Sequence, residues 1–390
     1  MKKIRKFSAL MPELVTDILL RLPVSSLLRF RCLSRSLCSE IDSEKFVKNH
    51  LNSSIQRKTH QKLVIYNLEF KHFKDFYFAD FDDDLVDAFP HSNPLRGLSV
   101  YGSCNGLILL GSDLEVNYQS MNLAVWNPFT MRHNKLPLCP VQTLSEHRRF
   151  MSCGLGYDSA HDDYKVVMIS KVHDSNRVFY QVWVFGLKLN FWRRSRDLVD
   201  EVNTKVGRFA NGALYWVCKD KGVGFDLAKE VFFDIPLVFN WGSAVFPATF
   251  LLECLDSFDS LVVCGGNLYF RIWHHENVEF YLLVSDVSDK GGEDGGVSWR
   301  KEFTIVNVET VLPDVQVFPL WPLAYSKDGD SILLGGLNGV FWYNLENKTN
   351  QRVSIAGLPY VPWFRYNVCW ESLVSVGNDS TFDGAAEEEI

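Results

Sequence analysis

The sequence predicts a mainly β protein that begins with a small α-helical domain. Apolar residues between positions 8 and 51 recur every three to four residues, as on one face of a helix. From Leu63 onward they fall instead into short runs bounded by Gly, Asn, Asp or Pro, which is typical of strands. Aromatic residues make up 14% of the 390-residue chain and also favour sheets. A chain of this length suits one small and one large domain.

The helical part is expected to contain a few short helices. The first begins at Pro12, which suits a first helical position, and Pro23 ends it. Its apolar face is formed by Leu14, Val15, Ile18, Leu19 and Leu22. Ser25 or Ser26 is expected to cap the second helix, and Ser43 is expected to cap a last short helix.

This helical part has too few residues to support a core of its own easily. Its apolar side chains also cover more than one side of each helix. Two interpretations remain open from the pattern alone. Either the helices dock on the rest of the chain, or one of their faces awaits a partner protein.

A weak repeat runs through the β part. A strand, a polar turn and a second strand recur from residues 125, 184, 224, 284 and 342, with separations of 59, 40, 60 and 58 residues. Asn-Gly or Gly-Asn precedes several other strands, as in a tight turn that requires positive φ. The spacing is loosely that of kelch-type blades, and radial stacking would bury both faces of each sheet. The prediction is a kelch-like β-propeller, with blade number and ring closure left open.

The charge is unevenly distributed along the chain. The first 50 residues carry ten Lys and Arg against five Asp and Glu, a net charge of +5, so the total of −7 leaves −12 for the rest. An acidic bulk argues against a nucleic-acid-binding protein. The nine cysteines are scattered, which indicates reduced thiols in the cytoplasm or nucleus. No apolar run approaches the roughly 18 residues of a membrane span.

No sequence motif indicates catalysis or a cofactor. The chain has no nucleophile elbow, P-loop or zinc-protease motif. His274, His275 and Glu276 come together, but adjacent strand residues point to opposite faces, so no metal site is expected. Residues 377–390 form a polar, acidic tail that is expected to be disordered.

Two Pro-interrupted stretches near the end of the chain contain residue types that are enriched at binding hot spots. We treat these residues as candidates for contact with a target protein. They are Trp321, Trp363, Arg365 and Tyr366.

Residues 10–51 resemble the F-box motif of plant F-box proteins. The matching segments are Met11-Pro12, Ile18-Leu19, Leu22-Pro23, Leu27 to Leu33, Ser34 to Leu37, and Phe46 to Leu51. Downstream, "GLGYDSAHDDYKVV", "VWNPFTMRHNKLP", "VFGLKLNFWRRS", "NGALYW" and "ESLVSV" are similar, in the same order, to elements of the plant F-box-associated domain. The resemblance implies an F-box at 8–52 and a kelch-like propeller at 60–376.

The resemblance implies a role without a catalytic group. F-box proteins are substrate receptors of SCF-type cullin–RING ubiquitin ligases, so the expected partners are a Skp-type adaptor, the cullin and RING subunits behind it, and an unknown protein substrate. The positions that match the adaptor-facing residues are Pro12, Leu14, Ile18, Leu22, Pro23, Leu27, Leu28 and Arg31.

Three departures from the F-box pattern keep alternatives open. Leu37 stands where relatives usually have Trp, Glu40 where they have an apolar residue, and Met11 where they have Leu. A weakened F-box would make the chain a non-ligase interaction module or decoy. A galactose-oxidase-like propeller enzyme is the remaining alternative, but it would need a metal site that the spacing does not support.

Overall fold

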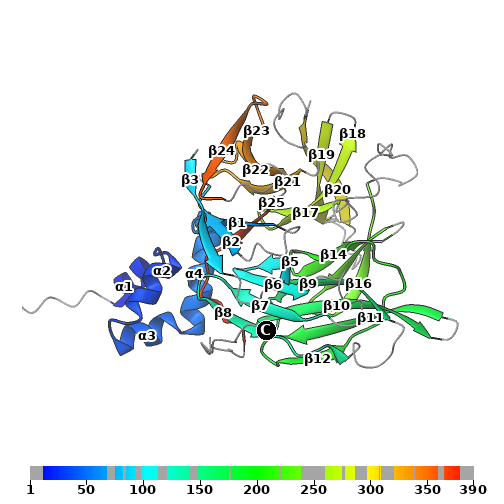
Figure 1. Cartoon of the computed structure of the whole chain (residues 1–390), viewed down its shortest axis with the longest axis horizontal. Helices are drawn as coiled ribbons and strands as arrows, with labels where there is room; N and C mark the ends of the chain where they lie inside the picture. Colours follow the sequence, from blue (N-terminus) through cyan, green and yellow to red (C-terminus); the bar gives the residue numbers. More distant parts are fainter. Residues whose placement is uncertain are drawn as a thin grey trace, which may run out of the picture.

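The computed structural model contains four helices followed by strands in six sheets (Figure 1). The structure describes residues 12–67, 75–81, 85–92, 98–112, 121–140, 148–174, 177–218, 221–238, 260–274, 277–285, 297–306, 308, 320–336, 339–358 and 364–377. Trp363, His275, Glu276 and the tail after Gly377 lie outside these ranges.

The helices are α1 (Pro12–Leu19), α2 (Val24–Phe30), α3 (Arg35–Ile41) and α4 (Glu44–Arg57). The hydroxyl of Ser43 accepts a hydrogen bond from the Phe46 amide, so the predicted cap of α4 is confirmed. The predicted cap of α2 is wrong. That helix starts at Val24 directly after Pro23, so Ser25 and Ser26 lie inside it.

The sheets follow one another along the chain. The first contains β1 (Gln61–Asn67), β2 (Asp75–Ala79), β4 (Phe89–Ser92) and β25 (Phe364–Trp370). The second contains β5 (Leu98–Cys104), β6 (Leu107–Ser112), β7 (Leu123–Asn127) and β8 (Arg132–Lys135). The third contains β9 (Arg148–Asp158), β10 (Asp163–Asp174), β11 (Arg177–Gly186) and β12 (Phe191–Arg194).

The other three sheets complete the set. The fourth contains β13 (Arg208–Ala210), β14 (Ala213–Val217), β15 (Gly222–Asp226) and β16 (Val231–Ile235). The fifth contains β17 (Leu261–Cys264), β18 (Asn267–His274), β19 (Asn277–Ser285) and β20 (Val297–Ile305). The sixth contains β21 (Trp321–Tyr325), β22 (Ser331–Gly336), β23 (Gly339–Asn344), β24 (Asn350–Ala356) and β3 (Leu85–Asp87).

The repeat seen in the sequence corresponds to one part of each blade. Its five copies are the outer hairpins of the second to sixth sheets, β7–β8, β11–β12, β15–β16, β19–β20 and β23–β24. Two Asn-Gly pairs form innermost turns: Asn105 has φ 52° and Gly106 φ 88° between β5 and β6, and Asn211 has φ 47° and Gly212 φ 79° between β13 and β14. Left-handed residues at both turn positions match the twist of the strands that the turn joins.

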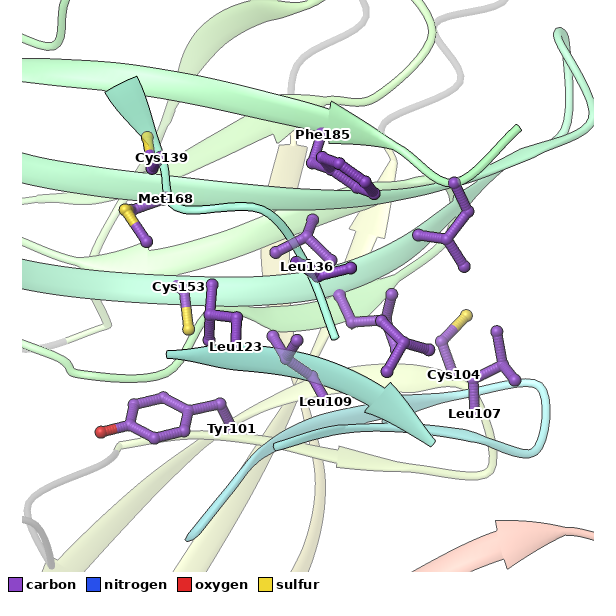
Figure 2. Packing of buried hydrophobic residues seen from close by; sticks show 14 of the residues in the cluster. Tyr101, Cys104, Leu107, Leu109, Leu123, Leu136, Cys139, Cys153, Met168 and Phe185 are labelled. Atoms are coloured by element: carbon purple, nitrogen blue, oxygen red, sulfur yellow. The ribbon is translucent and has the colours of Figure 1, made fainter. Parts of the chain in front are cut away.

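Apolar clusters between neighbouring sheets close the ring. The first and second sheets share Val64, Phe76, Ile108 and Trp126, and the sixth and first share Leu323, Leu333, Leu63 and Tyr366. Between the second and third sheets, Leu109, Leu123, Cys153 and Phe185 converge from different strands (Figure 2). Three similar clusters join the remaining neighbours. The predicted propeller is therefore confirmed, and it has six blades.

Two strand exchanges hold the ring closed. Strand β25, near the C-terminus, pairs antiparallel with β1, with Trp370 opposite Gln61. Strand β3 leaves the first blade and pairs in parallel with β24, at the outer edge of the sixth. In the sequence, the acidic run at 78–89 predicts a solvated turn or loop between early strands. This interpretation is wrong for β3 and for Phe81, which is 4% exposed in the core between these blades.

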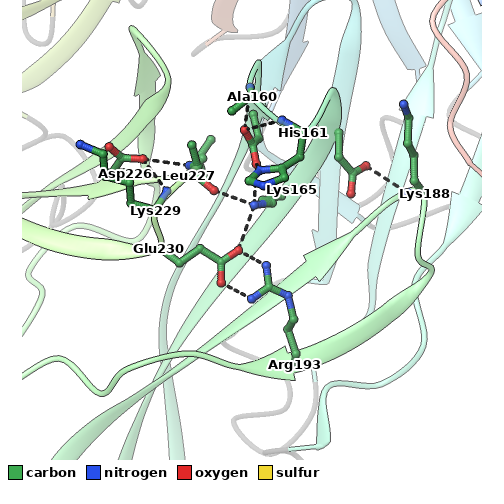
Figure 3. Close-up of polar contacts among 12 residues, drawn as sticks. Ala160, His161, Lys165, Lys188, Arg193, Asp226, Leu227, Lys229 and Glu230 are labelled. Atoms are coloured by element: carbon green, nitrogen blue, oxygen red, sulfur yellow. Dashed lines mark hydrogen bonds and ion pairs between the residues drawn. The ribbon is translucent and has the colours of Figure 1, made fainter.

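A polar network also joins the third and fourth blades. Lys165 is 5% exposed, and its ammonium group lies 2.7 Å from a carboxylate oxygen of Asp158 and 2.9 Å from one of Glu230. Figure 3 shows that Lys165 also donates to the Leu227 carbonyl, while Glu230 meets Arg193. A buried lysine needs such partners, so the network fixes the two blades relative to each other.

Candidate functional site

The outer surface of α1 exposes apolar side chains. Leu14 and Ile18 lie one helical turn apart, and each is 51% exposed. Leu33 follows α2 and is 68% exposed. Beneath these side chains, Leu19, Leu27, Ile41 and Phe46 form the core of the helical part. Paired apolar side chains that stay exposed on one face of a helix are suited to contact with another protein.

The predicted adaptor-facing residues do not all lie on this surface. Leu14 and Ile18 do, whereas Leu22, Pro23, Leu28 and Arg31 are partly buried, and the side chain of Pro12 is not described. Leu27 has 0% exposure and belongs to the core, so the structure corrects its expected outward orientation. Leu33 is not among the predicted adaptor-facing residues, because its spacing from Leu27 and Phe30 is also that of a continuing helix. In the structure, α2 ends at Phe30 and Leu33 stands in the turn beyond it.

Two of the three positions that depart from the F-box pattern, Leu37 and Glu40, fit the structure, and the third, Met11, lies outside the described residues. Leu37 packs against the core of the helical part, and its amide donates to the hydroxyl of Ser34, the cap of α3. Glu40 is exposed, and one of its carboxylate oxygens lies 3.4 Å from the Thr16 hydroxyl. Neither residue leaves a buried charge in the chain by itself.

The inner side of the helical part is fixed to the propeller by α4. Leu51 and Val47 pack in the cluster between the second and third blades. Lys48 pairs with Asp162 at 2.5 Å, in the turn between β9 and β10. Of the two interpretations left open by the sequence, docking on the chain therefore holds for α4, while the outer face of α1 stays uncovered (Figure 1).

The segment after β25 joins both parts. Glu371 accepts a hydrogen bond of 3.0 Å from the Val24 amide, so its carboxylate caps α2 from 347 positions away in the chain. This placement also stabilises the positive end of the helix dipole. Leu373 packs against the helical core, while Val374 and Val376 enter the cluster between the second and third blades. The carbonyls of Ser372 and Val374 accept from the Asn127 amide, at 3.0 and 2.8 Å.

Two stacked histidines lie in the same junction. The rings of His50 and His60 are 5.7 Å apart, and His50 Nε2 donates to the Leu22 carbonyl at 2.8 Å. Burial lowers the pKa of both imidazoles, while the carboxylate of Glu371 opposes this shift. Both rings are therefore neutral at pH 7.

A second candidate surface lies at the axis of the propeller. The inner strands β25, β5, β9, β13, β17 and β21 follow one another around this axis. The Arg365 guanidinium of β25 lies 4.6 Å from the ring centre of Trp321 in β21, and both residues are partly buried. Tyr366, the third described candidate for target contact, is 8% exposed and packs in the core between the sixth and first blades.

The possible metal ligands and the thiols can be placed where the structure describes them. Among the described residues, no group of three or more His, Cys, Asp and Glu side chains is placed to hold a metal ion. Burial raises the pKa of the Cys104, Cys153, Cys264 and Cys369 thiols, which disfavours the reactive thiolate. None of the helices that the structure describes is both long and apolar enough to cross a membrane.

Comparisons with known proteins match both parts of the chain. A family model for the F-box domain matches residues 7–49, and a model for the F-box associated β-propeller domain matches residues 74–240. The F-box protein CPR1 of Arabidopsis thaliana is 28% identical over 376 residues, which cover 89% of this chain and 84% of that protein.

Two further Arabidopsis thaliana proteins are similar along most of their length. F-box protein At4g22390 is 28% identical and covers 93% of this chain and 89% of its own. F-box/kelch-repeat protein At3g23880 is 25% identical, and the match covers 86% of this chain and 87% of that protein. A solved oligogalacturonate lyase in complex with manganese aligns over 77% of this chain and 80% of its own, with 9% identity and a TM-score of 0.38, which is too low to bear on function.

Proposed function

The chain belongs to the plant F-box proteins with a C-terminal F-box-associated β-propeller domain, and from this premise we propose that it is the substrate-recognition subunit of an SCF-type ubiquitin ligase. Its F-box binds a Skp-type adaptor, which connects it to the cullin and RING subunits. Its propeller binds the protein to be ubiquitinated, in the cytoplasm, the nucleus or both. The chain itself supplies no catalytic group.

The observation that carries this proposal is the contrast between the two sides of the helical part. Leu14 and Ile18 remain half exposed on α1, whereas Val47 and Leu51 of α4 pack against the propeller. An adaptor that covers α1 removes this apolar surface from water at no cost to the packing of α4.

The mechanism that follows is one of proximity. The F-box and the propeller are joined by apolar packing of Leu51, by the Lys48–Asp162 ion pair and by the Glu371 cap. A target held on the propeller therefore keeps a defined position relative to the ligase core. Holding a substrate lysine near the thioester of the conjugating enzyme turns a bimolecular encounter into an effectively intramolecular reaction.

The proposal is tested by co-expression with a Skp-type adaptor and by measuring the affinity of the purified pair. We expect a stoichiometric complex for the native chain. The double variant Leu14→Asp/Ile18→Asp should weaken it at least about a hundredfold, because two apolar contacts at an interface centre are lost. The matched control is Leu189→Asp, since Leu189 is also apolar and 63% exposed but lies between β11 and β12 in the third blade.

Two results would contradict the proposal. One is the absence of a complex between the folded native chain and any Skp-type adaptor. The other is an equal loss of affinity in the α1 variant and in the Leu189→Asp control, because the effect would then not depend on the α1 surface. Unchanged thermal unfolding of both variants, measured in parallel, excludes misfolding as the cause.

A further inference from the structure

The arginine at the propeller axis lies at the end of the ring that faces away from the F-box. Strand β25 runs from Phe364 to Trp370, and the next residue, Glu371, caps α2. Arg365 is therefore separated from the F-box end of its strand by five residues, or about 17 Å of extended chain. Trp321 is the first residue of the neighbouring inner strand, β21. An adaptor bound to α1 would therefore not cover the Arg365–Trp321 pair.

Arg365 has no carboxylate partner in the part of the chain that the structure describes. Its guanidinium lies over the face of Trp321, 4.6 Å from the ring centre. Other arginines are paired with acids: Arg21 with Asp17, Arg31 with Asp42, Arg193 with Glu230, Arg194 with Asp197 and Arg300 with Glu302. A guanidinium stacked by its face keeps its N–H edge free to bind a carboxylate with two hydrogen bonds.

The surroundings of Arg365 add positive charge. Tyr66 is its partner across the β1–β25 pair. Burial raises the pKa of the Tyr66 phenol, and the charges of Arg365 and of Arg208 oppose this rise. Arg208 begins β13, the inner strand of the fourth blade, so two inner strands from different blades bring guanidinium groups towards the same place.

We propose that this end of the axis, built on Arg365 and Trp321, binds an acidic peptide segment of the target protein. The inference rests on the proposed function and adds the chemical class of the target. A Glu or Asp carboxylate of the segment accepts hydrogen bonds from the Arg365 edge, while Trp321 holds the guanidinium in place. The chain after residue 50 has a net charge of −12, so it repels an extended polyanion such as a nucleic acid. A short segment with a few carboxylates reaches the local positive site without meeting that repulsion.

The test uses the full chain in complex with a Skp-type adaptor. The probe is a fluorescein-labelled hexaglutamate peptide blocked at both ends, and hexaglutamine is the neutral control. In fluorescence anisotropy we expect hexaglutamate to bind, hexaglutamine not to bind, and added salt to weaken binding. Arg365→Gln should weaken binding at least about tenfold, because one charge-assisted contact is lost. The affinity of Arg365→Lys for hexaglutamate should lie between those of the native chain and Arg365→Gln, since lysine keeps the charge but lacks the planar guanidinium group.

A matched variant controls for nonspecific attraction. Arg352→Gln removes the same charge from the sixth blade, where the Arg352 guanidinium lies 5.9 Å from the ring of Phe341 but on the outer strand β24. We expect this variant to bind hexaglutamate as the native chain does. Thermal unfolding of each variant shows whether the ring is intact.

Four outcomes overturn the inference. In the first, hexaglutamate does not bind, and in the second it binds equally to the native and Arg365→Gln chains. In the third, Arg352→Gln weakens hexaglutamate binding as much as Arg365→Gln does. Self-association that Arg365→Gln abolishes would also overturn it and assign the site to a second copy of the chain. Adaptor binding is measured in the same samples, so loss of peptide binding with an intact adaptor complex rejects the acidic target alone. Failure of the adaptor complex rejects the proposed function.

Discussion

Helices α1 and α4 belong to the same small domain but differ in what their apolar side chains contact. On α1, Leu14 and Ile18 are each 51% exposed, whereas on α4, Phe46 is 2% and Leu51 6% exposed. The α4 residues pack within the chain, in the helical core and in the cluster between the second and third blades. The comparison shows that an amphipathic pattern identifies an apolar face but not the molecule that covers it.

The largest effect is expected where α4 meets the propeller. Leu51→Ala should lower the free energy of unfolding by about 2–5 kcal/mol, because it removes a buried side chain and leaves a cavity. Leu14→Ala, on α1, should change it by no more than about 0.5 kcal/mol, since its side chain is half exposed. Denaturant unfolding of both variants without the adaptor tests this contrast. Equal destabilisation would mean that α1 is packed as tightly as α4.

A smaller effect is expected at the cap that joins the C-terminal segment to α2. Glu371→Gln keeps the size of the side chain but removes the charge that the α2 dipole and Lys62, 3.5 Å away, both favour. The loss should be about 1–2 kcal/mol. Hydrogen exchange at the Val24 amide should quicken in this variant, while amides of β10 should keep their protection. Unchanged exchange at Val24 would show that the cap contributes little.

The sequence predicted the fold more fully than it predicted the site. Helical and strand-like periodicities located the two parts, and the repeated outer hairpins indicated a propeller, because these signals depend on neighbours along the chain. The Glu371 cap and the parallel β3–β24 pair join positions hundreds of residues apart, and no local spacing encodes them. The Leu27–Leu28 pair shows a finer limit: both are apolar and adjacent, and only packing decides that Leu27 is buried.

The smallest effect is expected from acidification, and it concerns the α4 side of the comparison. Burial lowers the pKa of His50 and His60 below the ordinary value of 6.5, so the unfolded chain binds protons there more readily than the folded chain does. The free energy of unfolding should therefore be constant between pH 7 and 8 and fall as the pH drops below 6.5. Asp162, which Lys188 and Lys48 hold at a lowered pKa, loses its contribution only below about pH 4, outside this window.

The variant His60→Gln isolates this contribution. It removes one of the two titrating rings at the junction, so stability should fall less steeply between pH 6.5 and 5.5 than in the native chain. Urea unfolding at closely spaced pH values provides the measurement, and the flat region above pH 7 serves as its internal control. An unchanged slope in His60→Gln would show that His60 is as readily protonated in the folded chain as in the unfolded one. Helix α1 contributes no histidine, and its exposed Leu14 and Ile18 carry no charge to titrate. A loss of stability confined to this pH window would therefore be assigned to the α4 junction and not to the outer face of α1.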